Sequence, residues 1–482
     1  MRRTKIVCTL GPASDGPDQL RLLVAAGMNV ARLNFSHGTH AEHKKRLDTL
    51  RQVAAEAGKS VAVLQDLSGP KIRIGKVKQG TTLEPDARLV LTSAAVPEGD
   101  EKTVCLPVPE LIAACGPGSR LLLDDGLLEL VVMDKTATEL VTRVVTGGPL
   151  GSQKGICAPS VSLSIEAVTD KDEADVRFGL DAGVDYVALS FVRSADDVLR
   201  LRGIMQAHGR QVPIIVKIEK AEAVANLDAI LEVADAAMVA RGDLGIEMPI
   251  EEVPLVQKKV IHACNRLGKT VITATQMLDS MIRNPRPTRA EVTDIANAVF
   301  DGTDALMLSG ETAVGAYPVA AVETMARIAD TAEESEDYAR ILHEKQAQHG
   351  TESVTDAISE AVATIAQDTG AKAILCATTS GNTARNVSKF RPRVPIFATT
   401  TSEETFRQMA LLWGVLPALA PMPENTDALI AQTIQAAQER GLVQTGDRVV
   451  ITAGTPLGVP GSTNLIKVHT IGDALQPPAT EP

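Results

Sequence analysis

The segment PIIVKIEKAEAVANLDAILEVADAAMVARGD (213–243) contains one full repeat of the pattern that decides the fold of this chain. An apolar, β-branched run ends abruptly in charged residues, a helix-like stretch follows, and a second apolar run ends in the same way. Near-continuous apolar runs are typical of strands that are buried on both faces of a parallel sheet. The segment therefore predicts a strand, a crossing helix and a second, parallel strand.

Runs of this kind recur along the chain. Helix-like segments lie between them, and several end in a glycine that fits the left-handed residue closing a helix, as in DAGVDY (181–186) and RLGKTV (266–271). Eight βα units in series predict an α/β fold with a (β/α)8, or TIM, barrel formed by residues 1–69 and 164–335. The eight runs are KIVCTL (5–10), NVARLNFS (29–36), VAVLQD (61–66), DYVALSF (185–191), PIIVKIE (213–219), AAMVARGD (236–243), TVITATQ (270–276) and ALMLSG (305–310).

The barrel pattern is interrupted once and is followed by a second α/β region. Residues 70–163 contain short strand-like segments joined by Asp-Gly and Asp-Lys turns, which predict an inserted small β-barrel lid domain that could exclude water from the site. Residues 336–475 predict a C-terminal α/β regulatory domain with parallel strands at AKAILCAT (371–378), VPIFATTT (394–401) and DRVVITAG (447–454). Residues 476–482 are expected to be a disordered tail.

Composition limits the possible partners. The net charge is −12 with no basic block, which argues against nucleic acid as a partner. An anionic substrate must therefore be held by a few local cations. No apolar run approaches the ~18 residues of a membrane span. The six scattered cysteines lack metal-ligand spacing and indicate free thiols, so we expect a cytoplasmic protein.

The charged residues at the strand ends indicate the chemistry, because active sites of such barrels lie at the carboxyl ends of the strands. Lys217 and Glu219 point to the same side of one strand, and Asp243 follows the next. Two carboxylates at neighbouring strand ends suit a Mg²⁺ ion, and the lysine offers a charge for an anionic group. The alternative is a buried structural ion pair between Lys217 and Glu219.

Around these residues the chain resembles the pyruvate kinase family. IIVKIEKAEAVANLDAI, MVARGDLGIE and ITATQMLDSM look like that family's active-site signature. NVARLNFSHG, QDLSGPKIR and DGTDALMLSGETAVGAYP match its other characteristic segments, and the resemblance runs from about residue 3 to about residue 472. It implies a glycolytic enzyme that moves the phosphoryl group of phosphoenolpyruvate to ADP, giving pyruvate and ATP, and a homotetramer.

The resemblance also implies roles for individual residues. Glu219 and Asp243 would bind the essential Mg²⁺ or Mn²⁺, while Lys217 and Arg32 would contact the transferred phosphoryl group. The amides of Gly242 and Asp243 would hold the substrate carboxylate together with Thr275, which would also organise the water that protonates the enolate. The expected ADP contacts are Asn34, His37, Arg73 and Lys154.

The monovalent-cation position departs from that of K⁺-dependent relatives. Its expected ligands are the side chains of Asn34, Ser36 and Asp66 and the carbonyl of Leu67. Lys71 stands where those relatives have a nearby glutamate. Its ammonium, expected near Asp66, could occupy the place of K⁺ and compete with the ion by charge repulsion. K⁺ is therefore expected not to be required; the alternative is that Lys71 faces solvent or reaches an ADP phosphate.

A candidate control site follows a strand of the C-terminal region. Amides and hydroxyls at such a turn can form an anion-binding cradle. An ordinary helix cap rich in Ser and Thr would have the same sequence pattern. The resemblance implies a phosphate site for a sugar phosphate or AMP, completed by a loop from Gly454 to Gly461. The cradle residues are Thr378, Thr379, Ser380, Gly381, Asn382 and Thr383.

Two other functions use the same residues. Lys217 on a barrel strand could be the amine of a Schiff-base aldolase, although flanking carboxylates keep an amine protonated. Alternatively, the chain could bind phosphorylated metabolites without catalysis.

Overall fold

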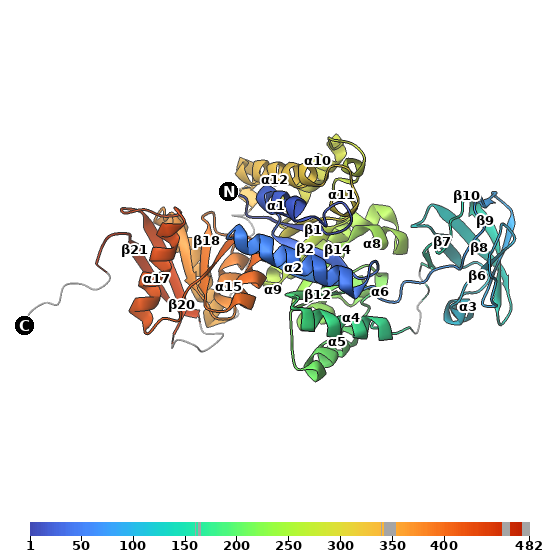
Figure 1. Cartoon of the computed structure of the whole chain (residues 1–482), viewed down its shortest axis with the longest axis horizontal. Coiled ribbons are helices and arrows are strands. Elements are labelled where there is room, and N and C mark those ends of the chain that lie inside the picture. Colours follow the sequence, from blue (N-terminus) through green and yellow to red (C-terminus); the bar gives the residue numbers. More distant parts are fainter. Residues whose placement is uncertain (160, 162–164, 339, 342–352, 456–462, 475–482) are drawn as a thin grey trace, which may run out of the picture.

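The computed structural model divides the chain into three parts placed side by side (Figure 1). A central barrel lies between a small β domain on one side and a C-terminal α/β domain on the other. The structure describes residues 1–159, 161, 165–338, 340–341, 353–455 and 463–474. The predicted tail at 476–482 and most of the loop from Gly454 to Gly461 lie outside the described residues.

The centre of the molecule is a closed barrel of eight parallel strands in the order β1-β16-β15-β14-β13-β12-β3-β2. Each strand coincides with one of the eight predicted runs, so the predicted (β/α)8 barrel is confirmed. The strands are β1 (Lys5–Thr9), β2 (Val30–Asn34), β3 (Ala62–Asp66), β12 (Tyr186–Leu189), β13 (Ile214–Ile218), β14 (Ala236–Ala240), β15 (Thr270–Ala274) and β16 (Ala305–Leu308).

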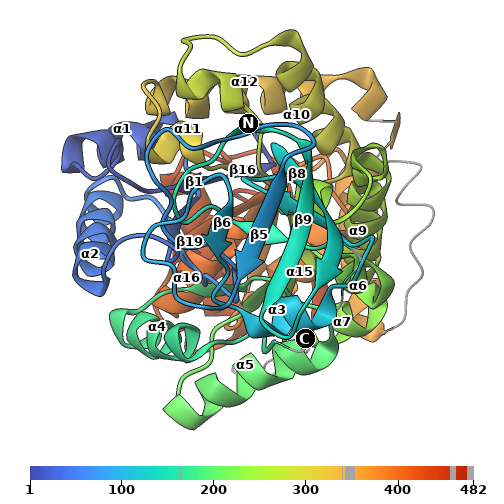
Figure 2. The ribbon, with the colours of Figure 1, turned by 90° about the vertical axis from the view of Figure 1, so that its right-hand side faces the viewer.

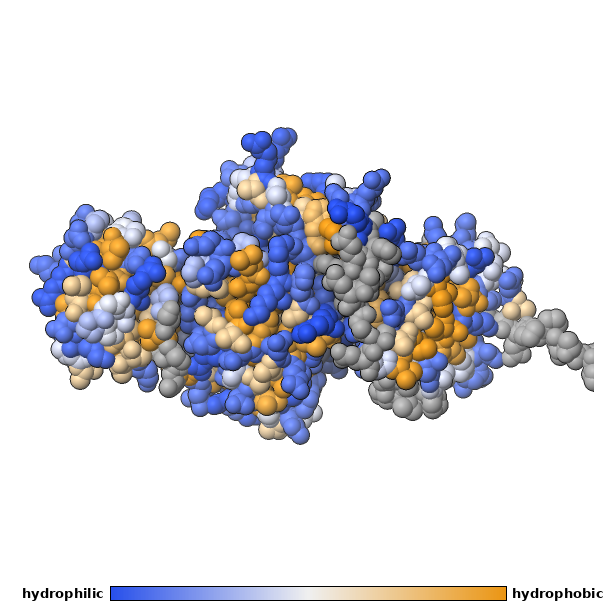
Figure 3. Space-filling model, turned by 180° about the vertical axis from the view of Figure 1, so that it is seen from behind, coloured by the Kyte–Doolittle hydropathy of each residue, from blue (hydrophilic) through white to orange (hydrophobic). Residues whose placement is uncertain are grey.

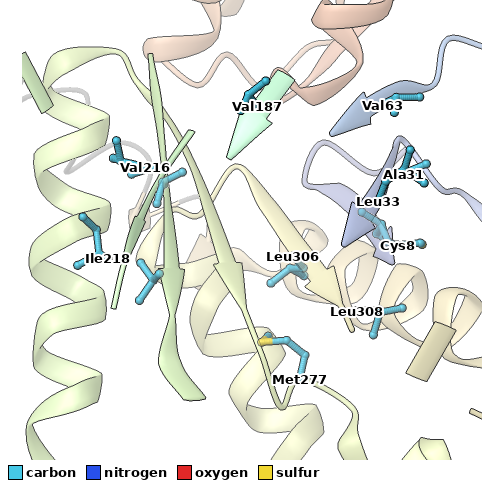
Figure 4. Packing of buried hydrophobic residues seen from close by; sticks show 14 of the residues in the cluster. Cys8, Ala31, Leu33, Val63, Val187, Val216, Ile218, Met277, Leu306 and Leu308 are labelled. Atoms are coloured by element: carbon cyan, nitrogen blue, oxygen red, sulfur yellow. The ribbon is translucent and has the colours of Figure 1, made fainter. Parts of the chain in front are cut away.

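Two apolar layers explain why these strands are almost continuously hydrophobic. One set of side chains, including Val7, Ile215 and Ile272, fills the barrel interior. The alternate set packs outward against the helices, as Figure 4 shows for Val216, Leu306 and their neighbours. Ala410 and Leu411 of the C-terminal domain join the interior cluster. That domain therefore closes the end of the barrel opposite the carboxyl ends of the strands.

Helices follow the strands and cover the barrel. Gly183 and Gly268 end two of them with φ of 88° and 65°, the left-handed caps predicted from the sequence. The helices are α1 (Pro17–Ala26), α2 (His40–Glu56), α4 (Asp170–Ala182), α5 (Ala195–His208), α6 (Ala221–Ala225), α7 (Leu227–Val233), α8 (Arg241–Glu247), α9 (Val253–Leu267), α10 (Arg289–Asp301), α11 (Gly310–Ala313) and α12 (Pro318–Glu334), with 3₁₀ turns η1 (Ile250–Glu252) and η2 (Asp279–Ile282).

The inserted domain, here called the lid domain, has its own hydrophobic core. Its hydrogen-bonded strands form an open six-stranded sheet, β11-β7-β8-β9-β5-β6, and a two-stranded ribbon, β10-β4, instead of one closed small barrel. The elements are β4 (Thr82–Leu83), β5 (Arg88–Thr92), β6 (Thr103–Cys105), α3 (Pro109–Ala114), β7 (Arg120–Leu123), β8 (Leu128–Lys135), β9 (Glu139–Thr146), β10 (Gly148–Pro149) and β11 (Ile156–Cys157).

The C-terminal domain is a five-stranded sheet in the order β19-β18-β17-β20-β21. Its three predicted strands are present, and β19 and the antiparallel β21 are additional. Its elements are α14 (Val354–Asp368), β17 (Ala373–Ala377), α15 (Asn382–Lys389), β18 (Ile396–Thr400), α16 (Glu403–Gln408), η3 (Met409–Leu411), β19 (Val415–Leu419), α17 (Thr426–Glu439), β20 (Arg448–Gly454) and β21 (Thr463–Thr470).

Polar contacts fix the C-terminal domain to the barrel. The guanidinium of Arg407 donates to the buried carboxylate of Asp185 at 2.8 Å, and the Tyr186 hydroxyl donates to the Gln408 carbonyl at 2.7 Å. On the face seen in Figure 3, hydrophobic residues form separate patches on all three parts. Among the described helices, none combines the length and apolar character needed to cross a membrane.

Gly179 of α4 provides a test of the barrel packing. A Cβ at this position would lie 2.0 Å from Oε1 of Gln65, a β3 side chain held by its hydrogen bond to the Asp175 carbonyl. Overpacking of this kind destabilises a protein by about 1–3 kcal/mol, so Gly179→Ala should lower the melting temperature in scanning calorimetry. Gly203 of α5 has no atom within 4 Å of its added Cβ. Gly203→Ala should therefore match or exceed the wild-type melting temperature. Equal changes of melting temperature in the two variants would contradict the close packing of Gly179 against Gln65.

Candidate active site

The charged and polar residues predicted at the strand ends converge at the mouth of the barrel. In Figure 2, strands β5, β8 and β9 of the lid domain lie in front of this mouth. A cleft of about 860 Å³ separates barrel and lid, and its walls include Asp243 and Glu247 from α8 and Lys71 and Cys157 from the connections to the lid. The candidate site therefore lies between a rigid barrel and a separately folded domain.

Lys217 is the central cation of the site. It lies on β13 with 12% of its side chain exposed, and its Nζ lies 2.7 Å from Oε1 of Glu219 and 3.5 Å from Oδ1 of Asp66. The amine also donates to the Ser190 hydroxyl at 2.8 Å. Ser190 in turn donates to the Leu67 carbonyl, which ties the end of β12 to the residue that follows β3. Contacts from three strand ends thus hold the Lys217 amine in one position.

Arg32 completes a chain of alternating charges. Its Nε donates to Oδ2 of Asp66 at 2.6 Å, and its Nη1 donates to the Thr9 hydroxyl at 2.9 Å. Both Arg32 and Asp66 are buried. Because one charge alone at such a site would carry a large desolvation penalty, the two cations and the two carboxylates depend on one another.

The pKa shifts follow from this arrangement. Burial alone lowers the pKa of Lys217, but Asp66 and Glu219 outweigh it and raise the pKa above its usual value. Burial raises the pKa of Asp66, but Lys217 and Arg32 outweigh it, so that pKa is lowered. The pKa of Glu219 is raised by burial despite Lys217, and the charge of Asp243 adds to the rise. Lys217 is therefore a permanent ammonium at neutral pH.

Glu219 and Asp243 have the properties of a cation site. Oε1 of Glu219 is buried and accepts no hydrogen bond of acceptable geometry, although Lys217 lies 2.7 Å away, and Oε2 accepts from the Phe191 amide at 2.8 Å. A buried acceptor without a hydrogen bond, next to a second carboxylate that disfavours its ionisation, fits a divalent cation that both could share. The described residues contain no cluster of three or more His, Cys, Asp or Glu side chains suited to a metal. A metal here would need its other ligands from substrate or water.

The loop after β15 is strained. Thr275 and Gln276 have φ of 66° and 55°, a left-handed conformation that is unfavourable for a β-branched residue. The Thr275 hydroxyl accepts from the Gly242 amide at 2.8 Å and donates to the Ala274 carbonyl at 2.7 Å. Strain of this kind persists only where surrounding contacts enforce it, and it is common at active sites.

Arg241 supplies those contacts. Its guanidinium donates to the carbonyls of Ala274 and Thr275 at 3.2 and 2.7 Å, and to the carboxylate of Asp294 at 2.6 Å. One side chain therefore connects the end of β14, the strained loop after β15 and helix α10.

The residues predicted to contact ADP do not form one cluster. Asn34 accepts from the Ser36 amide at 3.1 Å, and His37 is exposed nearby at the end of β2. Arg73 donates to the Gln153 carbonyl at 3.0 Å, and Lys154 pairs with Asp124 at 2.8 Å, both beside the lid. The two pairs lie on the barrel and lid sides of the mouth.

Lys71 lies inside the cleft, away from Asp66. Its Nζ is 3.8 Å from Asp243 and 3.7 Å from Asp125 of the lid. Among the described ion pairs, none joins Lys71 to Asp66, whose partners are Arg32 and Lys217. The amine is thus next to the candidate metal carboxylate, on the hinge between barrel and lid.

The predicted control loop forms a compact turn between β17 and α15. Gly381 has a φ of 82°, and its amide donates to the Thr378 hydroxyl at 3.0 Å. The Thr379 carbonyl accepts from Thr405 at 3.0 Å, and Thr383 contacts Thr463 at 3.0 Å. The loop is therefore tied to α16 and β21.

Sequence reasoning missed four residues of the site: Thr9, Ser190, Phe191 and Arg241. Two signals were available, because Thr9 and Ser190 also lie at the carboxyl ends of barrel runs, where site residues gather. No sequence signal marks the amide of Phe191 or the direction of the Arg241 side chain, since both depend on tertiary contacts.

Fold and site together define a barrel enzyme built to hold an anionic substrate next to a fixed ammonium and a pair of carboxylates. The comparisons with known proteins make this specific. Residues 1–322 match the family model "Pyruvate kinase, barrel domain", and residues 356–469 match "Pyruvate kinase, alpha/beta domain". The chain therefore belongs to the pyruvate kinase family, and it is a phosphotransferase acting on phosphoenolpyruvate and ADP.

Individual relatives support the same assignment. The pyruvate kinase of Geobacillus stearothermophilus is 51% identical over 478 residues, which cover 98% of this chain and 81% of the relative. That of Staphylococcus saprophyticus is 49% identical over 479 residues, with the same coverage. That of Sporosarcina psychrophila is 48% identical over 479 residues.

The clamp formed by Arg241 can be tested without an activity assay. A charge-assisted hydrogen bond contributes about 1.5–3 kcal/mol, so Arg241→Lys, which cannot reach all three acceptors, should speed amide hydrogen exchange over residues 274–277 by about tenfold or more. Arg283→Lys is the control, because Arg283 is exposed and lies 3.9 Å from its partner Asp279. Unchanged exchange in Arg241→Lys would show that the loop keeps its conformation without the clamp.

Proposed function

We propose that Lys217 stabilises the phosphoryl group during its transfer from phosphoenolpyruvate to ADP. The observation that supports this role is the position of its largely enclosed ammonium, which is fixed by Glu219, Asp66 and Ser190 and stays charged because of the two carboxylates. Phosphoryl transfer depends on positioned charge more than on covalent chemistry by the protein. Arg32, held by Asp66, adds a second cation from β2.

Glu219 and Asp243 are proposed to hold Mg²⁺ or Mn²⁺. The buried Oε1 of Glu219, which accepts no hydrogen bond, supports this assignment. When bound, the ion would neutralise charge on the phosphoryl oxygens. The chain itself contributes a Glu219 whose Oε2 is already oriented by the Phe191 amide.

The strained loop is proposed to bind the substrate carboxylate. In the structure the Gly242 amide is bonded to the Thr275 hydroxyl, so both groups face the same space. A carboxylate could accept from the amides of Gly242 and Asp243 and from the Thr275 hydroxyl. Thr275 would then also be near the enolate carbon, where it could orient the water that delivers the proton.

For ADP we propose contacts from both sides of the mouth: Asn34 and His37 on the barrel, and Arg73 and Lys154 beside the lid. Asn34 ends barrel strand β2 and His37 follows it, whereas Arg73 and Lys154 belong to the inserted segment, which supports a role for lid movement. Closure of the lid would bring four polar side chains around the phosphates and exclude water from the transfer.

We also propose that the enzyme works without K⁺. The position formed by Asn34, Ser36, Asp66 and Leu67 resembles the K⁺ site of relatives, and Lys71 replaces the glutamate found near it there. The Lys71 amine lies in the same cleft, 3.8 Å from Asp243, and none of the described ion pairs joins it to Asp66, so the support is its charge in the cleft and not occupation of that position. It already supplies a positive charge that would repel a second monovalent cation.

The turn at 378–383 is proposed to bind the phosphate of a sugar phosphate or AMP effector. Its hydroxyls and the left-handed Gly381 support an anion cradle, whereas a helix cap remains the competing interpretation. Homotetramer formation is carried over from the family. A cytoplasmic location accords with the six free cysteines, a state maintained in reducing compartments.

The Schiff-base alternative is disfavoured by the same charges. An aldolase lysine needs a neutral amine, yet Asp66 and Glu219 raise the pKa of Lys217. A protein that binds phosphorylated metabolites without catalysis would not require the strained Thr275 or the Glu219 acceptor. Turnover of phosphoenolpyruvate and ADP in an assay would exclude this alternative directly.

Removal of the Lys217 ammonium should abolish most of the activity. Lys217→Met is expected to lower kcat by about 10³-fold or more, since roughly 4 kcal/mol of transition-state stabilisation is lost. Lys259→Met is the control, because that lysine is exposed on α9 and, within the described part of the chain, its amine donates to the Val224 carbonyl and to no carboxylate. A near-native kcat in Lys217→Met would refute the role assigned to this side chain.

The monovalent-cation proposal predicts full turnover of phosphoenolpyruvate, ADP and Mg²⁺ with tetramethylammonium as the only added monovalent cation. Lys71→Glu should lose about tenfold or more of that turnover and regain it when K⁺ is added, because the carboxylate attracts the ion that the ammonium repels. If the wild-type enzyme is silent in tetramethylammonium and active in K⁺, Lys71 does not replace the ion.

A further inference from the structure

A second cationic pocket lies at the opposite end of the barrel from the active site, where α15 of the C-terminal domain meets the barrel. It spans about 260 Å³, including space that is open to solvent. The barrel side is formed by the end of α9 and the start of β15, and the other side by α15 and the residues that follow it (Figure 1). Four cationic side chains line it against a single carboxylate: Lys269, Arg385, Lys389 and Arg391 against Asp304.

Ion pairs account for only two of these cations. Arg391 pairs with Asp304 at 2.7 Å, and Lys389 pairs with Asp356 at 3.2 Å. In the described part of the chain, neither Lys269 nor Arg385 forms a salt bridge with a carboxylate. Their hydrogen bonds go to neutral oxygens: Lys269 donates to the Ala234 carbonyl at 2.5 Å, and Arg385 donates to the Asn382 side chain at 3.0 Å.

These two cations also affect each other. Burial lowers the pKa of Lys269; Asp235 opposes this shift, while the charge of Arg385 adds to it. Neither cation has a carboxylate within ion-pair distance among the described residues, so the repulsion between them is only partly offset by Asp235. An anion bound between them would remove this repulsion and would satisfy donors contributed by both domains.

We propose that this pocket binds a phosphate group, held by Lys269 of the barrel and Arg385 of α15. A phosphate offers several acceptor oxygens to a lysine and an arginine fork at once, a geometry that chloride cannot supply. The ligand is either inorganic phosphate or the phosphate of a small monoester. The site is separate from the 378–383 turn, because Lys269 belongs to the barrel and the pocket includes no residue of that turn.

A tryptophan beside the pocket can report binding through its fluorescence. Trp413 is the only tryptophan of the chain, and the Arg391 guanidinium lies 4.7 Å from the centre of its ring. Its carbonyl accepts from the Ser388 hydroxyl at 2.7 Å, and Ser388 lines the pocket. A change of charge beside Arg391 should therefore alter the tryptophan fluorescence.

The test is equilibrium dialysis of the full chain with radiolabelled inorganic phosphate at constant ionic strength in chloride, with tryptophan fluorescence recorded in parallel. Lys269→Met should weaken phosphate binding at one site by about tenfold or more, because a charged hydrogen-bonding partner is lost. Lys269→Arg and the exposed-lysine control Lys372→Met should retain binding at this pocket. Ser380→Ala should also leave binding at this pocket unchanged and should weaken only the separate binding proposed for the 378–383 turn.

Melting curves establish that each variant is folded, and Arg385→Met provides an independent variant on the other side of the pocket. Competition with glycerol 3-phosphate separates the two ligand sources. If glycerol 3-phosphate displaces the bound radiolabelled phosphate at a lower concentration than unlabelled inorganic phosphate does, the pocket is a monoester site. The proposal is overturned if the binding isotherms of Lys269→Met and Arg385→Met coincide with that of the wild type, or if Ser380→Ala alone abolishes binding.

Discussion

The burial of charge at the barrel mouth is the constraint on which the rest of the structure depends. Lys217 is surrounded by Asp66 and Glu219, and Asp66 is shared with Arg32. Among the described ion pairs, removing Asp66 leaves Arg32 without a carboxylate, and removing Lys217 leaves Glu219 without a cation, a state that costs several kcal/mol. The parallel barrel makes the arrangement possible, because neighbouring strands bring their carboxyl ends together. The rigid layers of apolar residues inside and outside the strands then hold these ends in place.

Around this rigid centre, the lid domain and the C-terminal domain contact opposite ends of the barrel. The lid domain has a separate core and meets the barrel across an open cleft that includes Lys71 and Asp243. The C-terminal domain instead closes the other end of the barrel, with Ala410 and Leu411 packed into its interior. Strand β15 connects the two ends: Thr270 lines the cationic pocket and Thr275 follows the strand into the active site.

The sequence predicted the barrel well because its strands are buried on both faces and so appear as continuous apolar runs. Strands that are not buried along their whole length were missed. β19 (Val415–Leu419) contains Pro417, and β21 (Thr463–Thr470) has two exposed and four half-buried positions. In the site, the strand-end rule found Lys217, Glu219 and Asp243. It gave no means of finding the Arg241 clamp or placing the Lys71 amine beside Asp243, since long flexible side chains are directed by tertiary contacts.

We propose that Glu219 and Asp243 are held ready for a divalent cation next to the fixed Lys217 ammonium. The most direct test is a Mn²⁺ titration followed by electron paramagnetic resonance, comparing the wild type with Glu219→Gln and with Glu222→Gln, a nearby cleft residue outside the pair. We expect one Mn²⁺ site in the wild type. Its Mn²⁺ affinity should be unchanged in Glu222→Gln and about tenfold or more weaker in Glu219→Gln, where an anionic ligand is lost. Equal Mn²⁺ affinity in all three proteins would contradict it.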